Sequence, residues 1–268
     1  MEEAEYHKMF EYEDTHWWFR GKRSVVAGVL ARWGPARRAC RSLDVGCGTG
    51  ANLELLGRYG EAHGVDVSPL ALAFCRRRGL RNLACASAAG LPYRDRSFDV
   101  VAILDVLYHR RVSDVCASLR EAYRVCRPGG LVVITDAAFE ALRGPHDVAY
   151  HGARRFRRRE LARAVAESGF TVVKCSYLNA LLFPLAAAVR LLERGRLGAS
   201  RPGSSLRRPR PAMNRVLEWV YGLEARLLPH ADLPFGLSVL VVGAKAPAPA
   251  GADHPPAALG SPPGTPPP

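Results

Sequence analysis

A glycine-rich run followed by an aspartate is the feature of this sequence whose spacing predicts ligand chemistry. Gly46, Gly48 and Gly50 follow an apolar run and precede a helical pattern. Glycine at such a turn permits positive φ and lets a ligand lie against the backbone, while the first N–H groups of the helix face that ligand. Asp66 ends the next apolar run, where a carboxylate can accept hydrogen bonds from both hydroxyls of a ribose. This pair predicts an adenosine-containing cofactor. Because Gly46-x-Gly48-x-x-Ala51 also fits the relaxed dinucleotide fingerprint, hydride transfer stays open.

Short apolar runs that alternate with amphipathic segments predict the elements that position this loop. Between residues 41 and 135 the pattern is typical of β-α-β units that build a mostly parallel sheet. Ser68 followed by Pro69 is typical of a helix start, and glycines end several of the helices. The predicted strands are 41–45, 62–66, 82–85, 98–103, 130–135, 170–176 and 237–244. The predicted helices are 51–59, 69–78, 114–125, 158–168, 178–194 and 213–228.

These elements predict an α/β fold with a Rossmann-like, seven-stranded, mostly parallel sheet flanked by helices. We expect an N-terminal helical cap at 1–35, and a core at 36–177 and 233–245. About sixty residues lie between the last two strands, so we expect a helical insertion at 178–232. The segment 246–268 is rich in Pro, Ala and Gly without apolar periodicity, which predicts a disordered tail.

Charge and cysteine content bear on the partners and the compartment. The 268 residues include 38 Lys and Arg against 25 Asp and Glu, a net charge of +13 that favours anionic partners or reflects a compositional bias towards Arg. The seven cysteines form no C-x-x-C pair, so we expect no metal site and no disulfide framework. The acidic start and the shortness of the apolar runs predict neither a secretory signal nor a membrane span. We expect a cytoplasmic protein that is at most peripheral to the membrane.

Several runs resemble the motifs of class I S-adenosylmethionine-dependent methyltransferases of the type 11 group. The run LDVGCGTG at 43–50 is similar to motif I of that family nearly letter for letter, and GVDVS at 64–68 resembles the tip of its second strand. The match continues with LPYRDRSFDVV at 91–101, LDVLYH at 104–109 and LREAYRVCRPGG at 119–130. The resemblance favours methyl transfer over hydride transfer and implies S-adenosyl-L-methionine as the cofactor.

The resemblance also implies which positions hold the cofactor. Asp44, Gly46 and Gly48 would lie by its methionine part, Asp66 would hold the ribose and Val67 would pack on adenine. The sequence departs from the family at 86–88, where Ala-Ser-Ala replaces the usual Gly-Asp-Ala, and a neutral serine binds the adenine amine more weakly than a carboxylate does. The predicted cofactor-binding set is Asp44, Gly46, Cys47, Gly48, Gly50, Asp66, Val67, Ser87, Ala88, Leu104 and Asp105.

Histidines supply the candidates for a catalytic base. Transfer from a sulfonium mainly needs alignment and exclusion of water, so catalytic residues can be few. His109 is the candidate catalytic residue because it follows the fourth strand at the carboxyl edge of the sheet, although a loop-capping role fits it equally well. His16, His146 and His151 lie in segments that could cover the site, and an ordinary loop role fits each of them.

Three segments outside the motifs bear on the acceptor. The aromatic and basic run 16–23 could close over the cofactor or dock a helix on the core. The run RRFRRR at 154–159 could bind nucleic acid or form a solvated face. The run LLFPL at 181–185, with Arg190 and Arg194, could line an apolar pocket, contact an anionic membrane or simply pack on the sheet.

The sequence therefore predicts an S-adenosylmethionine-dependent methyltransferase that acts on a small-molecule, lipid-linked or glycan-linked acceptor. Two alternatives remain. One is an RNA or protein methyltransferase, although no RNA-binding module is visible. The other is a catalytically silent, methyltransferase-like binding protein. The sequence leaves the oligomeric state open.

Overall fold

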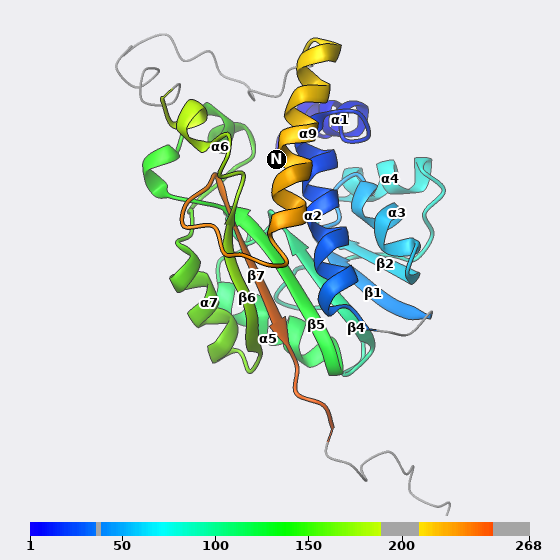
Figure 1. Cartoon of the computed structure of the whole chain (residues 1–268). Coiled ribbons are helices and arrows are strands. Elements are labelled where there is room, and N and C mark those ends of the chain that lie inside the picture. The colour runs from blue at the N-terminus through cyan, green and yellow to red at the C-terminus, as the bar shows by residue number, and fades with distance from the viewer. Residues whose placement is uncertain (36–38, 189–208, 249–268) are drawn as a thin grey trace, which may run out of the picture.

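The fold is built on one seven-stranded sheet with helices on both faces (Figure 1). The computed structural model describes residues 1–35, 39–188 and 209–248. The strand order is β3-β2-β1-β4-β5-β7-β6, in which β7 runs antiparallel to both of its neighbours and the other pairs are parallel. The predicted Rossmann-like sheet is thereby confirmed. The strands are β1 (Cys40–Val45), β2 (Gly60–Asp66), β3 (Leu83–Cys85), β4 (Phe98–Leu104), β5 (Cys126–Ala137), β6 (Thr171–Leu178) and β7 (Ser238–Ala244).

The central strands are buried on both sides, and their alternate residues belong to two different clusters. In β4, Val100 and Ala102 join a cluster with α2, α3 and α9, while Val101 and Ile103 join one with α5 and α7. A period of two places neighbouring side chains on opposite faces, and two covered faces are typical of parallel sheets. The helices are α1 (Glu3–Tyr12), α2 (Trp17–Trp33), α3 (Ala51–Gly57), α4 (Pro69–Arg77), α5 (Val115–Val125), α6 (Pro145–Ala149), α7 (Arg158–Glu167) and α9 (Pro211–Leu227), with a 3-10 turn η1 (Glu140–Leu142).

Helix starts follow the predicted capping chemistry. The Ser68 hydroxyl accepts a hydrogen bond from the Ala71 N–H at 3.4 Å, and Pro69 occupies the first turn of α4. The Asp114 carboxylate accepts from the Ala117 N–H at 2.9 Å at the start of α5. Side-chain acceptors at these positions satisfy N–H groups that a helix leaves unpaired.

Helices α2 and α9 pack against each other although nearly two hundred residues separate them in sequence (Figure 1). Gly21 lets the helices approach, because a Cβ atom there would overlap the fully buried Tyr221 ring. The Trp17 N–H also donates to Asn214 Oδ1 at 2.9 Å. The division into cap, core and insertion stays a prediction, but α2 and α9 lie in one helical layer over the sheet.

For two of the predicted elements, pairing between strands explains why the bounds differ in the structure. The helix expected over 178–194 is wrong at its start, because Leu178 is the last residue of β6 and pairs with Ser238 of β7. Helical backbone begins only at residue 183, and 189–208 lie outside the described residues, as do 249–268 of the predicted tail. Strand β5 is longer than the expected 130–135, because β7 pairs with it as far as Ala137. Pairing between distant strands fixed these ends, and a local apolar pattern does not report such pairing.

Candidate functional site

The carboxyl ends of β1, β2, β4 and β5 meet along one edge of the sheet and line a cavity of about 670 Å³. The chain runs outwards in opposite directions from β1 and β4, so these two neighbouring strands form the topological switch point. Ligands of open α/β sheets bind at such a point. The volume falls within the range of about 300–1,000 Å³ that is typical of small-molecule sites.

The glycine loop turns sharply from β1 into α3. Gly46 and Gly48 have φ values of +74° and +54°, in the left-handed region that favours glycine. A Cβ atom on Gly46 would lie 2.5 Å from Cγ2 of Val106, and one on Gly48 would lie 2.6 Å from Cε of Met9. The loop therefore presents bare backbone to the cavity.

Asp66 lies at the tip of β2 and is bonded to the backbone around the loop. Its Oδ2 accepts from the Gly48 N–H at 3.0 Å and its Oδ1 accepts from the Ser68 N–H at 2.8 Å. Burial raises the pKa of the Asp66 carboxyl, while these two hydrogen bonds act in the opposite direction. Asp66 also lines the cavity, so it can accept from a ligand while the backbone fixes its orientation.

Asp44 is a buried carboxyl group beneath the same loop. Its side chain is 1% exposed, and neither oxygen has a hydrogen-bond partner in the part of the chain that the structure describes. Burial, and then the nearby charges of Asp66 and Glu13, raise the pKa of Asp44 to about 8. A buried acid without a partner is costly, so this position favours a ligand that brings a donor or a positive charge.

The structure brings nearly all of the predicted cofactor residues to one cavity wall. Every member of the set lines the cavity except Asp44 and Gly50, which lie behind the loop. Val67 is 46% exposed and offers an apolar surface beside Asp66. Ser87 also lines the cavity, but its hydroxyl accepts from the Ala89 N–H at 3.2 Å. Which of these residues contact the cofactor stays a prediction.

The N-terminal segment covers the glycine loop. Glu13 Oε1 accepts from the Thr49 hydroxyl at 2.5 Å and pairs with the Arg78 guanidinium at 2.7 Å. Arg78 also donates to the Thr49 carbonyl at 2.9 Å, and the side chains of both Arg78 and Glu13 are largely buried. This network joins the end of α1 to the loop and to the end of α4, so α1 lies over the predicted cofactor site.

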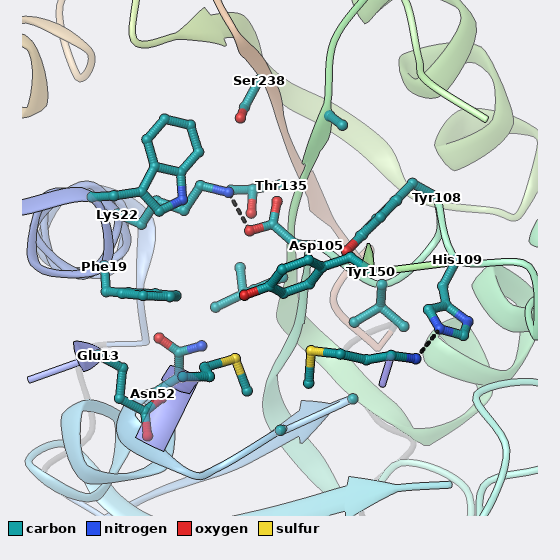
Figure 2. Close-up of a pocket in the computed structure, with 18 of the residues that line it drawn as sticks. Glu13, Phe19, Lys22, Asn52, Asp105, Tyr108, His109, Thr135, Tyr150 and Ser238 are labelled. Atoms are coloured by element: carbon teal, nitrogen blue, oxygen red, sulfur yellow. Dashed lines mark hydrogen bonds and ion pairs between the residues drawn. The ribbon is translucent and has the colours of Figure 1, made fainter. Parts of the chain in front are cut away.

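His109, the predicted catalytic residue, lines the cavity, and Figure 2 shows it apart from Glu13 and Asn52. Burial and the neighbouring N-terminal ammonium lower its pKa to about 4, so the ring is neutral at pH 7. Its Nδ1 accepts from the Arg111 N–H at 3.0 Å, and its Nε2 lies 3.1 Å from the Met1 nitrogen. A neutral imidazole carries one N–H, so with Nδ1 accepting, Nε2–H can donate only to a neutral Met1 amine, whose pKa burial lowers. The catalytic role of His109 stays a prediction.

The other histidines and the arginine run have structural partners. His16 caps α2, with its Nδ1 accepting from the Trp18 N–H at 3.2 Å, and His151 stacks near His109 at 5.9 Å between ring centroids. The side chain of His146 is outside the described part. Arg155 forms a buried, bidentate pair with Asp147 at 2.9 and 3.0 Å, so the expectation of a solvated face over 154–159 is wrong at this residue. The pair joins the start of the run to α6.

Another part of the lining brings Asp105 of the predicted set together with residues that the sequence motifs did not single out. Lys22 of α2 pairs with Asp105 after β4, beside Thr135 at the end of β5 (Figure 2). Tyr150 points into the cavity, and Ser238 begins β7 (Figure 2). Thr135 could have been found from its place at the carboxyl end of a predicted strand, but the other contacts depend on segments far apart in sequence.

The residues present fit S-adenosylmethionine. The unpartnered Asp44 carboxyl suits a cationic amino acid group, and Asp66 suits a pair of ribose hydroxyls. The positive φ of Gly46 and Gly48 gives close access to the backbone, and the exposed Val67 side chain suits an adenine ring.

Comparison with known proteins identifies the class. A family model described as a methyltransferase domain matches residues 43–134. The chain is 38% identical over 128 residues to a demethylmenaquinone methyltransferase of Tropheryma whipplei (strain Twist), covering 46% of this chain and 49% of that protein. It is 33% identical over 165 residues to the demethylmenaquinone methyltransferase of Geobacillus kaustophilus (strain HTA426), covering 55% of this chain and 69% of that protein.

A solved structure extends the likeness beyond the matched motifs. The geranyl diphosphate C-methyltransferase of Streptomyces coelicolor A3(2), in complex with S-adenosyl-L-homocysteine, aligns with a TM-score of 0.54 at 16% identity, covering 81% of this chain and 74% of that one. At this identity the likeness shows the fold.

The chain belongs to the class I S-adenosylmethionine-dependent methyltransferases, as the fold and the family matches together show. The alignment to the Tropheryma protein spans about half the length of that relative, and its substrate is a property of that protein.

Proposed function

We propose that this protein transfers a methyl group from S-adenosylmethionine to a small, largely apolar acceptor. The observation that carries the proposal is the single cavity with two unlike walls. One wall holds the glycine loop and Asp66, and the other is lined mainly by aromatic and aliphatic side chains. Similar methyltransferases are named for a demethylmenaquinone, a 24-methylenesterol and geranyl diphosphate, which supports an apolar acceptor.

The residues of the chain would bind, orient and enclose the reactants. Asp66 would hold the ribose, and Asp44 would compensate positive charge near the loop. When bound, S-adenosylmethionine supplies an activated sulfonium methyl group. Trp18 and Phe19 of α2 line the cavity and would exclude water from it, which favours transfer over side reactions.

Binding of the cofactor is the direct test. Titration of the whole chain with S-adenosylmethionine by calorimetry should give one saturable site. Asp66→Ala should weaken binding roughly ten- to hundredfold, because it removes a charged hydrogen-bond acceptor. Glu61→Ala, on the same strand but half-exposed, is the matched control and should leave the affinity unchanged.

Turnover separates an enzyme from a silent binding protein. Release of S-adenosylhomocysteine is measured with a panel of apolar phenols, enols, carboxylic acids and amines. Transfer to at least one acceptor supports the proposal. Cofactor binding with no transfer to any member would favour the binding protein, and preferential methylation of RNA would favour the nucleic-acid alternative.

The exposed face of α9 supports a second proposal, contact with an anionic membrane surface. Its apolar side chains Met213, Val216, Trp219 and Leu227 are more than half exposed, with Trp219 at 65%. Exposed arginines at 210, 215 and 226 accompany them, an arrangement typical of helices that lie on anionic lipid. Within the described ranges, no helix is long and apolar enough to cross a bilayer.

Vesicle sedimentation tests this contact. The chain should sediment with phosphatidylglycerol vesicles and not with phosphatidylcholine vesicles, and Trp219→Asp should reduce the bound fraction severalfold. Val173→Asp serves as the control, since this exposed apolar residue lies on β6. Equal sedimentation of the wild-type chain and Trp219→Asp would contradict the proposal.

A further inference from the structure

The acceptor half of the cavity contains a polar group of three side chains from three distant elements. Lys22 belongs to α2, Thr135 lies near the end of β5, and Ser238 begins β7. Figure 2 shows Lys22 directed towards Asp105, with Thr135 beside the pair. All three side chains line the cavity.

The Lys22 ammonium is held in place but retains hydrogen-bonding capacity. Its side chain is 11% exposed, it pairs with Asp105, and it lies 4.9 Å from the centroid of the Trp18 ring. An ammonium carries three N–H donors, and Asp105 is the one hydrogen-bonded partner of Lys22 in the described part of the chain. A donor with a positive charge is therefore fixed at the cavity wall.

Thr135 supplies an independent observation at the same place. The residue is 1% exposed, it lines the cavity, and its hydroxyl oxygen has no hydrogen-bond partner among the described residues. A buried hydroxyl without a partner costs free energy, so it indicates that a polar ligand atom completes the site.

The remaining lining defines the body of that ligand. Trp18, Phe19, Tyr108, Tyr150, Leu182 and Leu217 line the chamber. Aromatic rings of this kind bury a large apolar area at little cost in side-chain entropy. A ligand with one polar end and an otherwise apolar body suits this combination.

We propose that Lys22 and Thr135 bind an acidic oxygen, that of a phenol, enol or carboxylic acid, on an otherwise apolar methyl acceptor. This assignment rests on the proposed function and specifies its substrate class. A cationic end would be repelled by the fixed ammonium, and a neutral oxygen would accept from it more weakly than an ionised one. An acidic oxygen can share Lys22 with Asp105 and accept from the Thr135 hydroxyl. Asp105 then tunes the site, because it competes with the ligand for the same ammonium.

The backbone conformation of Asp105 tolerates a substitution that tests its competition with the ligand for the Lys22 ammonium. Its φ is +58°, in the left-handed region where Asp and Asn are the most tolerated residues after glycine. Asp105→Asn therefore keeps the backbone and removes the competing charge. Substitution of Lys22 and substitution of Asp105 should therefore change the affinity for an anionic ligand in opposite directions.

The experiment uses two fluorescent probes of the same shape that differ in charge. Anilinonaphthalenesulfonate carries an acidic oxygen group, and N-phenylnaphthylamine is its neutral counterpart. Both are titrated into the whole chain with and without S-adenosylhomocysteine, and the affinity for S-adenosylhomocysteine is measured separately by calorimetry. Binding of either probe to other apolar surfaces does not depend on Lys22, so comparing the affinities of the two probes corrects for it.

We expect Lys22→Met to weaken the sulfonate probe roughly ten- to hundredfold and the neutral probe less than about twofold. Thr135→Val should act in the same direction by a smaller factor, and Asp105→Asn should strengthen the sulfonate probe. Lys8→Met is the matched control, because Lys8 pairs with Glu5 on α1. The affinities of Lys8→Met for both probes and for S-adenosylhomocysteine should not change.

Three results would overturn the proposal. An equal loss of both probes in Lys22→Met would mean that Lys22 only supports the wall. A parallel loss of affinity for S-adenosylhomocysteine would assign Lys22 to the cofactor. Weaker sulfonate binding in Asp105→Asn would contradict the competition. Failure of the wild-type chain to bind S-adenosylmethionine would refute the proposed function instead, while the probe comparison without cofactor would still report on Lys22.

Discussion

The two walls of the cavity are built in different ways. The cofactor wall comes mainly from one continuous stretch, β1, the glycine loop, α3 and β2, and its contacts are largely to backbone, as when the Gly48 N–H donates to Asp66. The acceptor wall joins side chains from α2, β5, β7 and α9, which are far apart in sequence. A turn that depends on local backbone conformation has a short sequence motif, whereas side chains that line a wall from distant segments can change without altering the fold.

The largest effect on stability is expected on the acceptor side, where Arg155 and Asp147 form their buried pair. Arg155→Gln removes the guanidinium from a carboxylate whose side chain is 3% exposed, and should lower the free energy of unfolding by about 3–5 kcal/mol. Urea denaturation measures the change. Arg163→Gln, at 82% exposure, is the control and should cost less than about 0.5 kcal/mol. Similar losses in the two variants would contradict the importance of the buried pair.

The next effect concerns the cofactor wall. Gly46→Ala forces a side chain into φ +74° and against Val106, a backbone cost of about 1–2 kcal/mol before the contact is counted. We expect the affinity for S-adenosylmethionine to fall at least about tenfold, measured by calorimetry. Gly57→Ala is the control, because a Cβ atom there meets nothing within 4 Å, and it should bind normally. An unchanged affinity in Gly46→Ala would show that the loop is not in contact with the cofactor.

A glycine-to-alanine substitution in α2, behind the acceptor wall, should lower stability without changing the affinity for the cofactor. Gly21→Ala places a methyl group against the buried Tyr221 ring and should cost about 1–3 kcal/mol of stability through overpacking. The affinity of the folded fraction for S-adenosylmethionine should stay within about twofold, because Gly21 is absent from the cavity lining. Gly222→Ala, with nothing within 4 Å of a Cβ atom, is the control. A loss of affinity as large as that of Gly46→Ala would erase the distinction between the walls.

A further difference concerns proton uptake at Asp44. Its folded pKa of about 8 lies above the ordinary value of 3.8, so between these pH values the unfolded chain is ionised while the folded chain keeps its proton. The cofactor-free protein should therefore lose stability as pH rises through that window, and Asp44→Asn should flatten the dependence. Chemical denaturation between pH 5 and pH 8, roughly the window that linkage predicts, measures the slope.

Cofactor binding provides a second readout at the same carboxyl group. A cationic ligand group favours the ionised form, so binding near pH 6 should release up to about one proton. Calorimetry in two buffers of different ionisation enthalpy measures the release, and Asp44→Asn should show none from this site. Identical release in the wild-type chain and the variant would mean that Asp44 does not meet the cofactor.

The fold was predictable to the extent that it depends on local patterns. The alternation of apolar runs predicted all seven strands, and Ser68 and Asp114 lie at helix starts as their chemistry requires. The end of β6 was not predictable, because Leu178 is held in the sheet by pairing with Ser238, sixty residues later. The glycine loop and Asp66 were predictable as parts of the cavity lining, since they are fixed by the turn and by the strand tip, while the contacts to the cofactor stay a prediction.

The sequence alone determined the family and the cofactor loop, because glycines with positive φ and an acid at a strand tip leave a short, local signature. Only the tertiary structure decided what faces that loop. It brought Lys22 beside Asp105 and Thr135 and placed Tyr221 against Gly21, and among the described residues it left the Asp44 carboxyl without a hydrogen-bond partner. These contacts follow from helix packing and strand order across the whole chain, where each pair is set by many distant residues at once.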